Sequence, residues 1–177
     1  MNEILWPAGY LPGKTDNFAS NETIVSNLTA EQVWANLQDT SVWESYYENV
    51  ADIRFLDASP GSHLELGSRF RFTTFGFPIE AEVVECVLPT ETTPGRLAWH
   101  GWEEGSEAED MLHVHHAWLI ENLSEGRVRV LTQETQNGAA AKAMAIEKPN
   151  PMINGHQEWI DGLIRTSQEQ HQVGEAK

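Results

Sequence analysis

The sequence has very little cysteine and few basic residues, and both shortages exclude whole classes of protein. Cys86 is the only cysteine among 177 residues, so neither an internal disulfide nor a zinc site built from cysteines can form. The chain has 11 Lys and Arg residues against 27 Asp and Glu residues, which gives a formal net charge of −16. Phosphate contacts need clustered Lys and Arg side chains, so we expect no nucleic acid among the partners of this protein.

Long apolar runs and familiar catalytic motifs are also missing. No stretch approaches the ~18 apolar residues of a membrane-spanning helix, and the N-terminus lacks the basic and apolar regions of a signal peptide. We therefore expect a cytoplasmic protein with no membrane insertion. The sequence contains no glycine-rich phosphate loop, nucleophile elbow or His-Glu-x-x-His motif, so no covalent chemistry is visible and we expect no cofactor.

The residues that are abundant point to one packed domain. Hydrophobic residues make up 40 % of the chain and include seven tryptophans, which is enough for a real core at this length. Residues 1–18 interleave aromatic residues with Pro and Gly, a pattern typical of an extended arm without regular structure. We expect this arm to be followed by a single domain over residues 19–171.

The clearest periodic pattern lies near the C-terminus. Apolar residues recur from Met152 to Ile164 at helical spacing, which predicts a long helix with one apolar face. Asn150 followed by Pro151 is typical of an N-cap and a first helical residue. A single amphipathic helix needs an apolar surface to lie against, so we expect it to pack in the hollow of a sheet.

The preceding segments predict that sheet. A strand around Ile24 and Val25 comes first, and two short helices follow, the first opened by a capping box of Thr29 and Gln32. From residue 50 to residue 138 the apolar period is two, and turn residues separate about six strands. We therefore predict an α+β fold in which a curved antiparallel sheet of about seven strands wraps around the long C-terminal helix.

Several short motifs occur in an order that is specific when they are taken together. They are Thr29-Ala30-Glu31-Gln32-Val33-Trp34 followed by Asp39 and Trp43, Gly67-Ser68-Arg69-Phe70-Arg71-Phe72, Glu82-Val83-Val84-Glu85 followed by Pro89, Arg96-Leu97-Ala98-Trp99, and Gly155-His156-Gln157-Glu158-Trp159. Over residues 20–168, this order resembles the SRPBCC superfamily of START-like, birch-allergen-like helix-grip domains, especially its polyketide cyclase/dehydrase and lipid-transport branch. The resemblance implies a cavity between sheet and helix that binds a small hydrophobic molecule, although functions within the superfamily are diverse.

The wall of the expected cavity consists of apolar residues that face the inside of the predicted fold. We expect the ligand to contact Trp43, Tyr47, Phe70, Phe72, Ile79, Val83, Trp99, Trp118, Met144, Met152 and Trp159. The same side chains also suit a packed core, and this alternative stays open.

Three ionisable residues, His116, Glu134 and His156, are the candidate catalytic residues. His116 lies on the apolar side of its strand beside Trp118, and a buried imidazole suits general acid or base chemistry. Glu134 is in phase with the inward positions of the last strand, where a carboxylate acts as a base or anchors a polar ligand group. A structural role is the alternative for each of them: a hydrogen-bonded core histidine, or a solvated strand end.

A second group of histidines has a spacing that suits metal ligands. His113 and His115 share one strand face, and hairpin pairing brings His100 within reach. That face is opposite the apolar one, so we expect both strand histidines to point toward solvent. We therefore predict no metal site.

Three functions are compatible with this fold. The first is binding of a small hydrophobic ligand in the internal cavity. The second is an enzyme of cyclase, dehydratase or hydrolase type that uses His116, with Glu134 or His156, for proton transfer. The third is a protein-interaction module like the chaperone activators of the same superfamily. A closed dry cavity favours binding, an open cavity with His116 hydrogen-bonded to a carboxylate favours catalysis, and an exposed apolar patch favours a protein partner.

Overall fold

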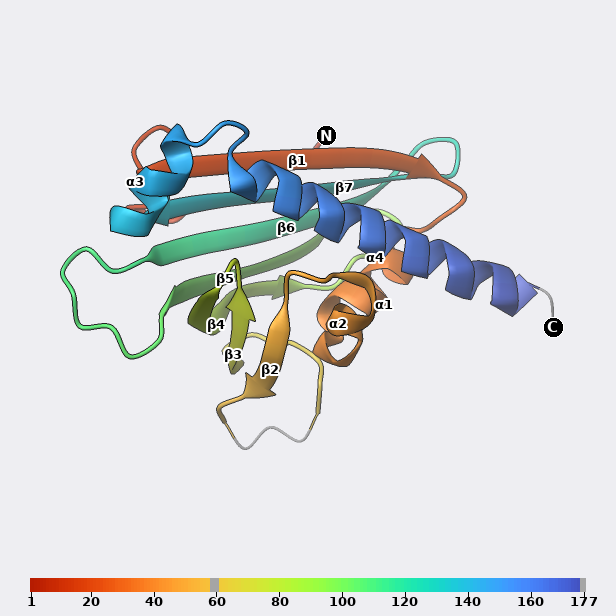
Figure 1. Cartoon of the computed structure of the whole chain (residues 1–177). Helices are drawn as coiled ribbons and strands as arrows, with labels where there is room; N and C mark the ends of the chain where they lie inside the picture. The colour runs from red at the N-terminus through yellow and green to blue at the C-terminus, as the bar shows by residue number, and fades with distance from the viewer. Residues whose placement is uncertain (58–60, 176–177) are drawn as a thin grey trace.

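The structure, a computed structural model, describes residues 1–57 and 61–175 (Figure 1). Within these residues one antiparallel sheet has seven strands: β1 (Asn17–Ser26), β2 (Ala51–Phe55), β3 (Arg69–Thr74), β4 (Phe77–Val87), β5 (Gly95–Glu103), β6 (His113–Leu123) and β7 (Arg127–Asn137). The helical segments are α1 (Ala30–Gln38), the 3-10 turn η1 (Thr40–Val42), α2 (Trp43–Tyr46), α3 (Ala139–Ile146) and α4 (Pro151–Glu175).

The strand order is β1-β7-β6-β5-β4-β3-β2, so the first strand pairs with the last one. β2 to β7 are sequential antiparallel neighbours, as strands alternating with turns predict. α4 runs across one face of this sheet and contacts β1, β7 and α1 (Figure 1). Two short helices follow β1. The predicted helix-grip architecture of the α+β class is therefore confirmed.

Both helix starts predicted from the sequence are present. The Thr29 side chain accepts a hydrogen bond from the Gln32 backbone N–H at 3.3 Å, and Gln32 Oε1 accepts one from the Thr29 N–H at 2.8 Å. This capping box opens α1. α4 begins at Pro151, where the Met152 N–H donates to Asn150 Oδ1 at 3.0 Å. Although α4 has 25 residues, no helix in the described part of the chain is long and apolar enough to span a membrane.

Aromatic side chains fill the space between the sheet and α4 on the side of α1 and α2. The Trp43 ring meets Trp159 edge to face at 5.0 Å between centroids, and Phe70 meets Trp99 in the same way at 5.8 Å. All four of these rings are at most 2 % exposed. Edge-to-face packing of this kind adds stability beyond the burial of area, so this end of the interior is a solid core.

Gly162 sets how closely α4 approaches α2. A Cβ atom at this position would collide with the backbone carbonyl oxygen of Tyr46. Since a backbone atom cannot swing aside as a side-chain tip can, only glycine permits this approach. The buried face of α4, which includes Met152, His156 and Ile160, is thereby held against the sheet.

Residues 1–16 lie on the sheet face opposite α4 and form turns without a helix or strand. The rings of Trp6 and Tyr10 lie 5.5 and 5.7 Å from the ring of His115, and Tyr10 stacks on His100 at 4.8 Å. His115 is consequently only 2 % exposed. The expectation that His115 points toward solvent is therefore wrong: its side chain does point away from α4, but the N-terminal segment covers it.

Candidate functional site

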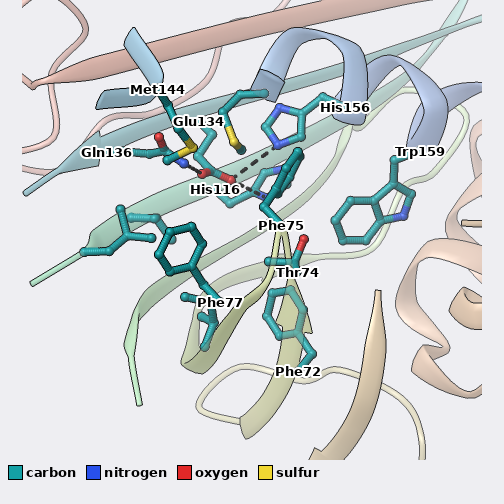
Figure 2. A pocket seen from close by; sticks show the side chains of 14 residues that line it. Phe72, Thr74, Phe75, Phe77, His116, Glu134, Gln136, Met144, His156 and Trp159 are labelled. Atoms are coloured by element: carbon teal, nitrogen blue, oxygen red, sulfur yellow. Dashed lines mark hydrogen bonds and ion pairs between the residues drawn. The ribbon is translucent and has the colours of Figure 1, made fainter. Parts of the chain in front are cut away.

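A pocket lies where β3, β4, β6 and β7 meet α3 and the first turns of α4 (Figure 2). Its wall is mostly apolar, and it consists of Phe72, Thr74, Phe75, Phe77, Ile79, Leu112, Val114, His116, Glu134, Gln136, Met144, Met152, His156 and Trp159. The cavity volume of this pocket is about 30 Å³. That is room for about two water molecules, because each needs roughly 10–15 Å³ of such volume.

Three ionisable side chains meet at the bottom of this pocket. His116 Nδ1 lies 2.9 Å from Glu134 Oε2, and His156 Nε2 lies 3.4 Å from the same oxygen. All three side chains are nearly inaccessible, with 3 %, 6 % and 1 % exposure for His116, Glu134 and His156. Figure 2 shows both imidazoles pointing at the carboxylate, which Gln136 contacts from its other side. We call these three residues the His-Glu-His cluster.

The sheet register and the start of α4 bring the cluster together. His116 on β6 and Glu134 on β7 are directly paired across the ladder, so their side chains leave the same face side by side. His156 follows the N-terminus of α4 by little more than a turn, where the helix passes over β7. Its ring stacks on the His116 ring at 4.6 Å between centroids. Two strands and a helix therefore each contribute one member.

Hydrogen bonds with Thr132 and Gln136 hold the cluster in place. His116 Nε2 lies 2.8 Å from Thr132 Oγ1, and Thr132 Oγ1 lies 3.3 Å from the Ala117 carbonyl oxygen. Gln136 Nε2 donates to Glu134 Oε1. The His116 ring is thus fixed by contacts at both nitrogens, and the carboxylate by contacts at both oxygens.

Burial sets the protonation state of His116, and contacts within the cluster set that of Glu134. Desolvation lowers the pKa of His116 to about 4, although the neighbouring Glu134 opposes this shift. Burial alone would raise the pKa of Glu134, but its interactions with His116 and His156 hold that pKa below its usual range. At neutral pH the pocket therefore contains a neutral His116 and an ionised Glu134, whose negative charge is stabilised by N–H donors.

This arrangement has two chemical capabilities. An imidazole hydrogen-bonded to a carboxylate is a proton-transfer pair of the kind used in general acid and base catalysis. One nitrogen or oxygen atom from each of the three side chains also lies within 4.8 Å of the other two, which is a geometry able to hold a metal ion. His100 and His115 pair on the other sheet face, beneath Tyr10.

The pocket contains some of the residues expected from the sequence. The structure brings together the three candidate catalytic residues with Phe72, Ile79, Met144, Met152 and Trp159. The other expected ligand contacts do not line this pocket but belong to the core, and they are Trp43, Tyr47, Phe70, Val83, Trp99 and Trp118. They pack together in the core that aromatic rings fill under α4.

Sequence reasoning missed the rest of the wall: Thr74, Phe75, Phe77, Leu112, Val114 and Gln136. Leu112 and Val114 are in phase with His116, and Gln136 is in phase with Glu134, so the strand period could have identified them. Phe75 has no such signal. It sits at the β3–β4 turn with a φ of 50°, next to Gly76 with a φ of 79°.

Comparisons with solved structures identify one similar sequence and several proteins of similar fold. A hypothetical protein from Helicobacter pylori is 48 % identical, with a TM-score of 0.89, and the match covers 94 % of this chain and 97 % of that one. A Thalictrum norcoclaurine synthase point mutant, solved with a transition-state analogue, has a TM-score of 0.59 at 9 % identity, covering 87 % and 95 %. The di-domain ARO/CYC BexL from the BE-7585A biosynthetic pathway has a TM-score of 0.50 at 12 % identity, covering 88 % and 43 %. No protein-family model and no curated protein matches the chain.

Proposed function

Because the chain shares the helix-grip fold of the norcoclaurine synthase and BexL structures, we propose that it binds a small molecule in the pocket between the sheet and α4. The ligand has an apolar body, about the size of one aromatic ring, and one polar group that donates hydrogen bonds. The observation that supports this proposal is the His-Glu-His cluster in the wall of a mostly apolar pocket.

The buried charge is the reason to expect a polar group on the ligand. Moving an ionised carboxylate away from water costs several kcal/mol unless other groups compensate it. A purely structural core avoids this cost by using apolar side chains, as the neighbouring aromatic core does. Glu134 instead stays in the pocket wall, where the polar group of a ligand can reach the cluster. A hydroxyl or amine suits an anionic site, and a carboxylate ligand would be repelled.

The volume of the pocket limits the size of the ligand. About 30 Å³ is far below the roughly 300 Å³ at which drug-sized sites begin. Binding of a single ring therefore requires that wall side chains move. Met144 and Met152 are unbranched and flexible, and Phe75 lies at the tip of a turn, so these three side chains can give way most easily. A long lipid chain does not fit without a larger rearrangement.

Thermal shift measurements on protein treated with a metal chelator test this proposal. We expect phenols and aromatic amines to raise the melting temperature, and aromatic carboxylates of the same size to have no effect. Glu134→Gln should weaken binding at least tenfold, because the hydrogen-bond acceptor loses its charge. His113→Ala, a change on the same strand outside the pocket, should bind like the unchanged protein. If no compound in the panel raises the melting temperature, the binding proposal is wrong.

A second candidate function is proton transfer, supported by the 2.9 Å contact between His116 and Glu134. An enzyme of cyclase or dehydratase type would use Glu134 or His116 to move a proton to or from the bound molecule. This function predicts protein-catalysed exchange of deuterium at a carbon next to the carbonyl of a small aromatic ketone, observed by NMR in D₂O. Glu134→Gln should abolish the exchange, while binding without exchange in the unchanged protein leaves binding as the function. The chaperone-activator-like role stays a prediction.

A further inference from the structure

The His-Glu-His cluster has the donor atoms and the spacing of a metal centre. Tetrahedral zinc places its ligand atoms about 3.3 Å apart, since zinc–nitrogen bonds are about 2.0–2.1 Å long. The two contacts to Glu134 Oε2 are 2.9 and 3.4 Å, and the three ligand atoms lie within 4.8 Å of one another. A shift of the two imidazoles by about 1 Å or less would complete this geometry.

The hydrogen bonds of Thr132 allow His116 to act as a ligand. A hydroxyl has one proton to donate, and Thr132 has two acceptors in reach: His116 Nε2 at 2.8 Å and the Ala117 carbonyl oxygen at 3.3 Å. Without metal, Thr132 donates to Nε2, and the proton on Nδ1 faces Glu134. When Thr132 donates to Ala117 instead, Nε2–H donates to Thr132. The lone pair of Nδ1 then faces the carboxylate, and a cation bound between them makes that arrangement favourable.

Outer contacts of this kind are typical of metal sites. A ligating histidine usually donates its second ring N–H to a fixed acceptor, and a ligating carboxylate is itself hydrogen-bonded. Thr132 supplies the first contact and Gln136 supplies the second. In the described part of the chain Nδ1 of His156 has no hydrogen-bond partner, so we expect an affinity about 10–100-fold below that of a fully supported site.

From these contacts we propose that His116 Nδ1, Glu134 and His156 Nε2 bind one divalent transition-metal ion, with zinc as the expected occupant. Two histidines and one carboxylate leave a fourth position open, as in catalytic rather than structural zinc sites. That position faces the pocket, whose volume of about 30 Å³ accommodates a metal-bound water. The proposal adds a cofactor to the pocket of the proposed function, but metal binding does not require the organic ligand.

Titration with cobalt and zinc tests the metal site. Protein stripped with a chelator is titrated with Co²⁺, which absorbs visible light strongly when tetrahedral, and then with Zn²⁺ by calorimetry. We expect one ion per chain, with zinc displacing cobalt. Glu134→Gln and His156→Gln should each weaken zinc binding at least tenfold. Thr132→Val, which removes the outer contact to His116 together with the hydrogen bond to the Ala117 carbonyl oxygen, should weaken it about 10–100-fold. His113→Ala should leave it unchanged.

Each outcome decides the proposal. The proposal is supported if zinc binds saturably with one ion per chain, and if the cluster variants lose this binding while His113→Ala retains it. A lack of saturable binding overturns the proposal. An equal loss of binding with His113→Ala also overturns it, because surface histidines would then explain the signal. Circular dichroism identifies variants that fail to fold, and Thr132→Val remains informative because it keeps the shape of the side chain. If stripped protein binds the phenols and amines but no metal, the metal proposal fails and the proposed function stands. If it binds zinc but none of the phenols and amines, the metal proposal stands and the proposed function fails.

Discussion

His116 and Glu134 are direct neighbours across the β6–β7 ladder, and their side chains meet at 2.9 Å with 3 % and 6 % exposure. This pairing places an ionised carboxylate inside an apolar pocket. It also makes the carboxylate the acceptor for N–H groups on three other side chains, those of His116, His156 and Gln136. Glu134 is therefore the residue on which both the stability and the chemistry of the pocket depend.

Replacing Glu134 with leucine should destabilise the protein. The substitution leaves N–H donors of His116, His156 and Gln136 buried without an acceptor, and each such group costs about 1–3 kcal/mol. Partial rearrangement reduces the sum, so we expect a loss of about 2–4 kcal/mol in the free energy of unfolding measured with urea. Gln133→Leu, on the same strand but on the other face, should change it by less than about 1 kcal/mol. A Glu134→Leu protein as stable as the original would mean that the cluster contributes nothing to folding.

Two glycines of α4 should respond to alanine in opposite directions. At Gly162 a Cβ meets the carbonyl oxygen of Tyr46, so Gly162→Ala should cost about 1–3 kcal/mol through overpacking. At Gly174 nothing lies within 4 Å, so Gly174→Ala should stabilise α4 by up to about 1 kcal/mol through helix propensity. Thermal unfolding of both variants provides the comparison. If Gly162→Ala is also neutral or stabilising, α4 does not approach α2 as closely as described.

Gly155 and Phe75 should be coupled. A Cβ at residue 155 would overlap the tip of the Phe75 ring, and that ring also lies edge to face against His156 at 6.5 Å. Gly155→Ala should therefore push Phe75 away from the pocket and change ligand binding more than it changes stability, because a ring on a turn can move.

A double-mutant cycle with Phe75→Ala measures this coupling. We expect the damage from Gly155→Ala to be smaller in the Phe75→Ala background, with an interaction free energy of about 0.5–3 kcal/mol. Strictly additive effects of the two substitutions on ligand affinity would show that Phe75 does not close the pocket over Gly155.

The stability of the protein should fall as the pH is lowered from about 6.5 to about 4. Burial under Trp6 and Tyr10 lowers the pKa of His115 to about 4, with His100 and His116 adding to the shift and Glu134 opposing it. The unfolded chain takes up a proton near pH 6.5, whereas the folded chain resists it until about pH 4. Protonation between these values therefore favours the unfolded state.

Urea unfolding at several pH values checks this expectation. His115→Gln removes the titrating group and should flatten the decrease in stability between pH 7 and pH 5, although His116 continues to contribute. Trp6→Ala, which uncovers His115, should flatten it as well. Identical pH profiles for all three proteins would place the titrating groups elsewhere.

Much of the fold could be predicted because local patterns specify it. The capping box at Thr29, the Asn150-Pro151 start of α4 and the alternating strands act over a few residues, and each is present in the structure. The inward orientation of His116 and Glu134 followed in the same way from the strand period. The division between pocket and core did not, because Phe70 and Phe72 alternate in the same way along β3 and both are buried, yet only Phe72 lines the pocket.

The sequence by itself therefore determined the order of elements, the face each strand turns inward and, with Cys86 as the only cysteine, the lack of an internal disulfide. Only the tertiary structure decided that His116, Glu134 and His156 meet, that Phe75 rests on Gly155, and that the N-terminal segment covers His115. The physical reason is how far apart along the chain the interacting residues lie. Helix caps and strand periods are set by neighbours along the chain, whereas the meeting of three side chains from β6, β7 and α4 depends on the strand register and on how closely α4 packs on the sheet.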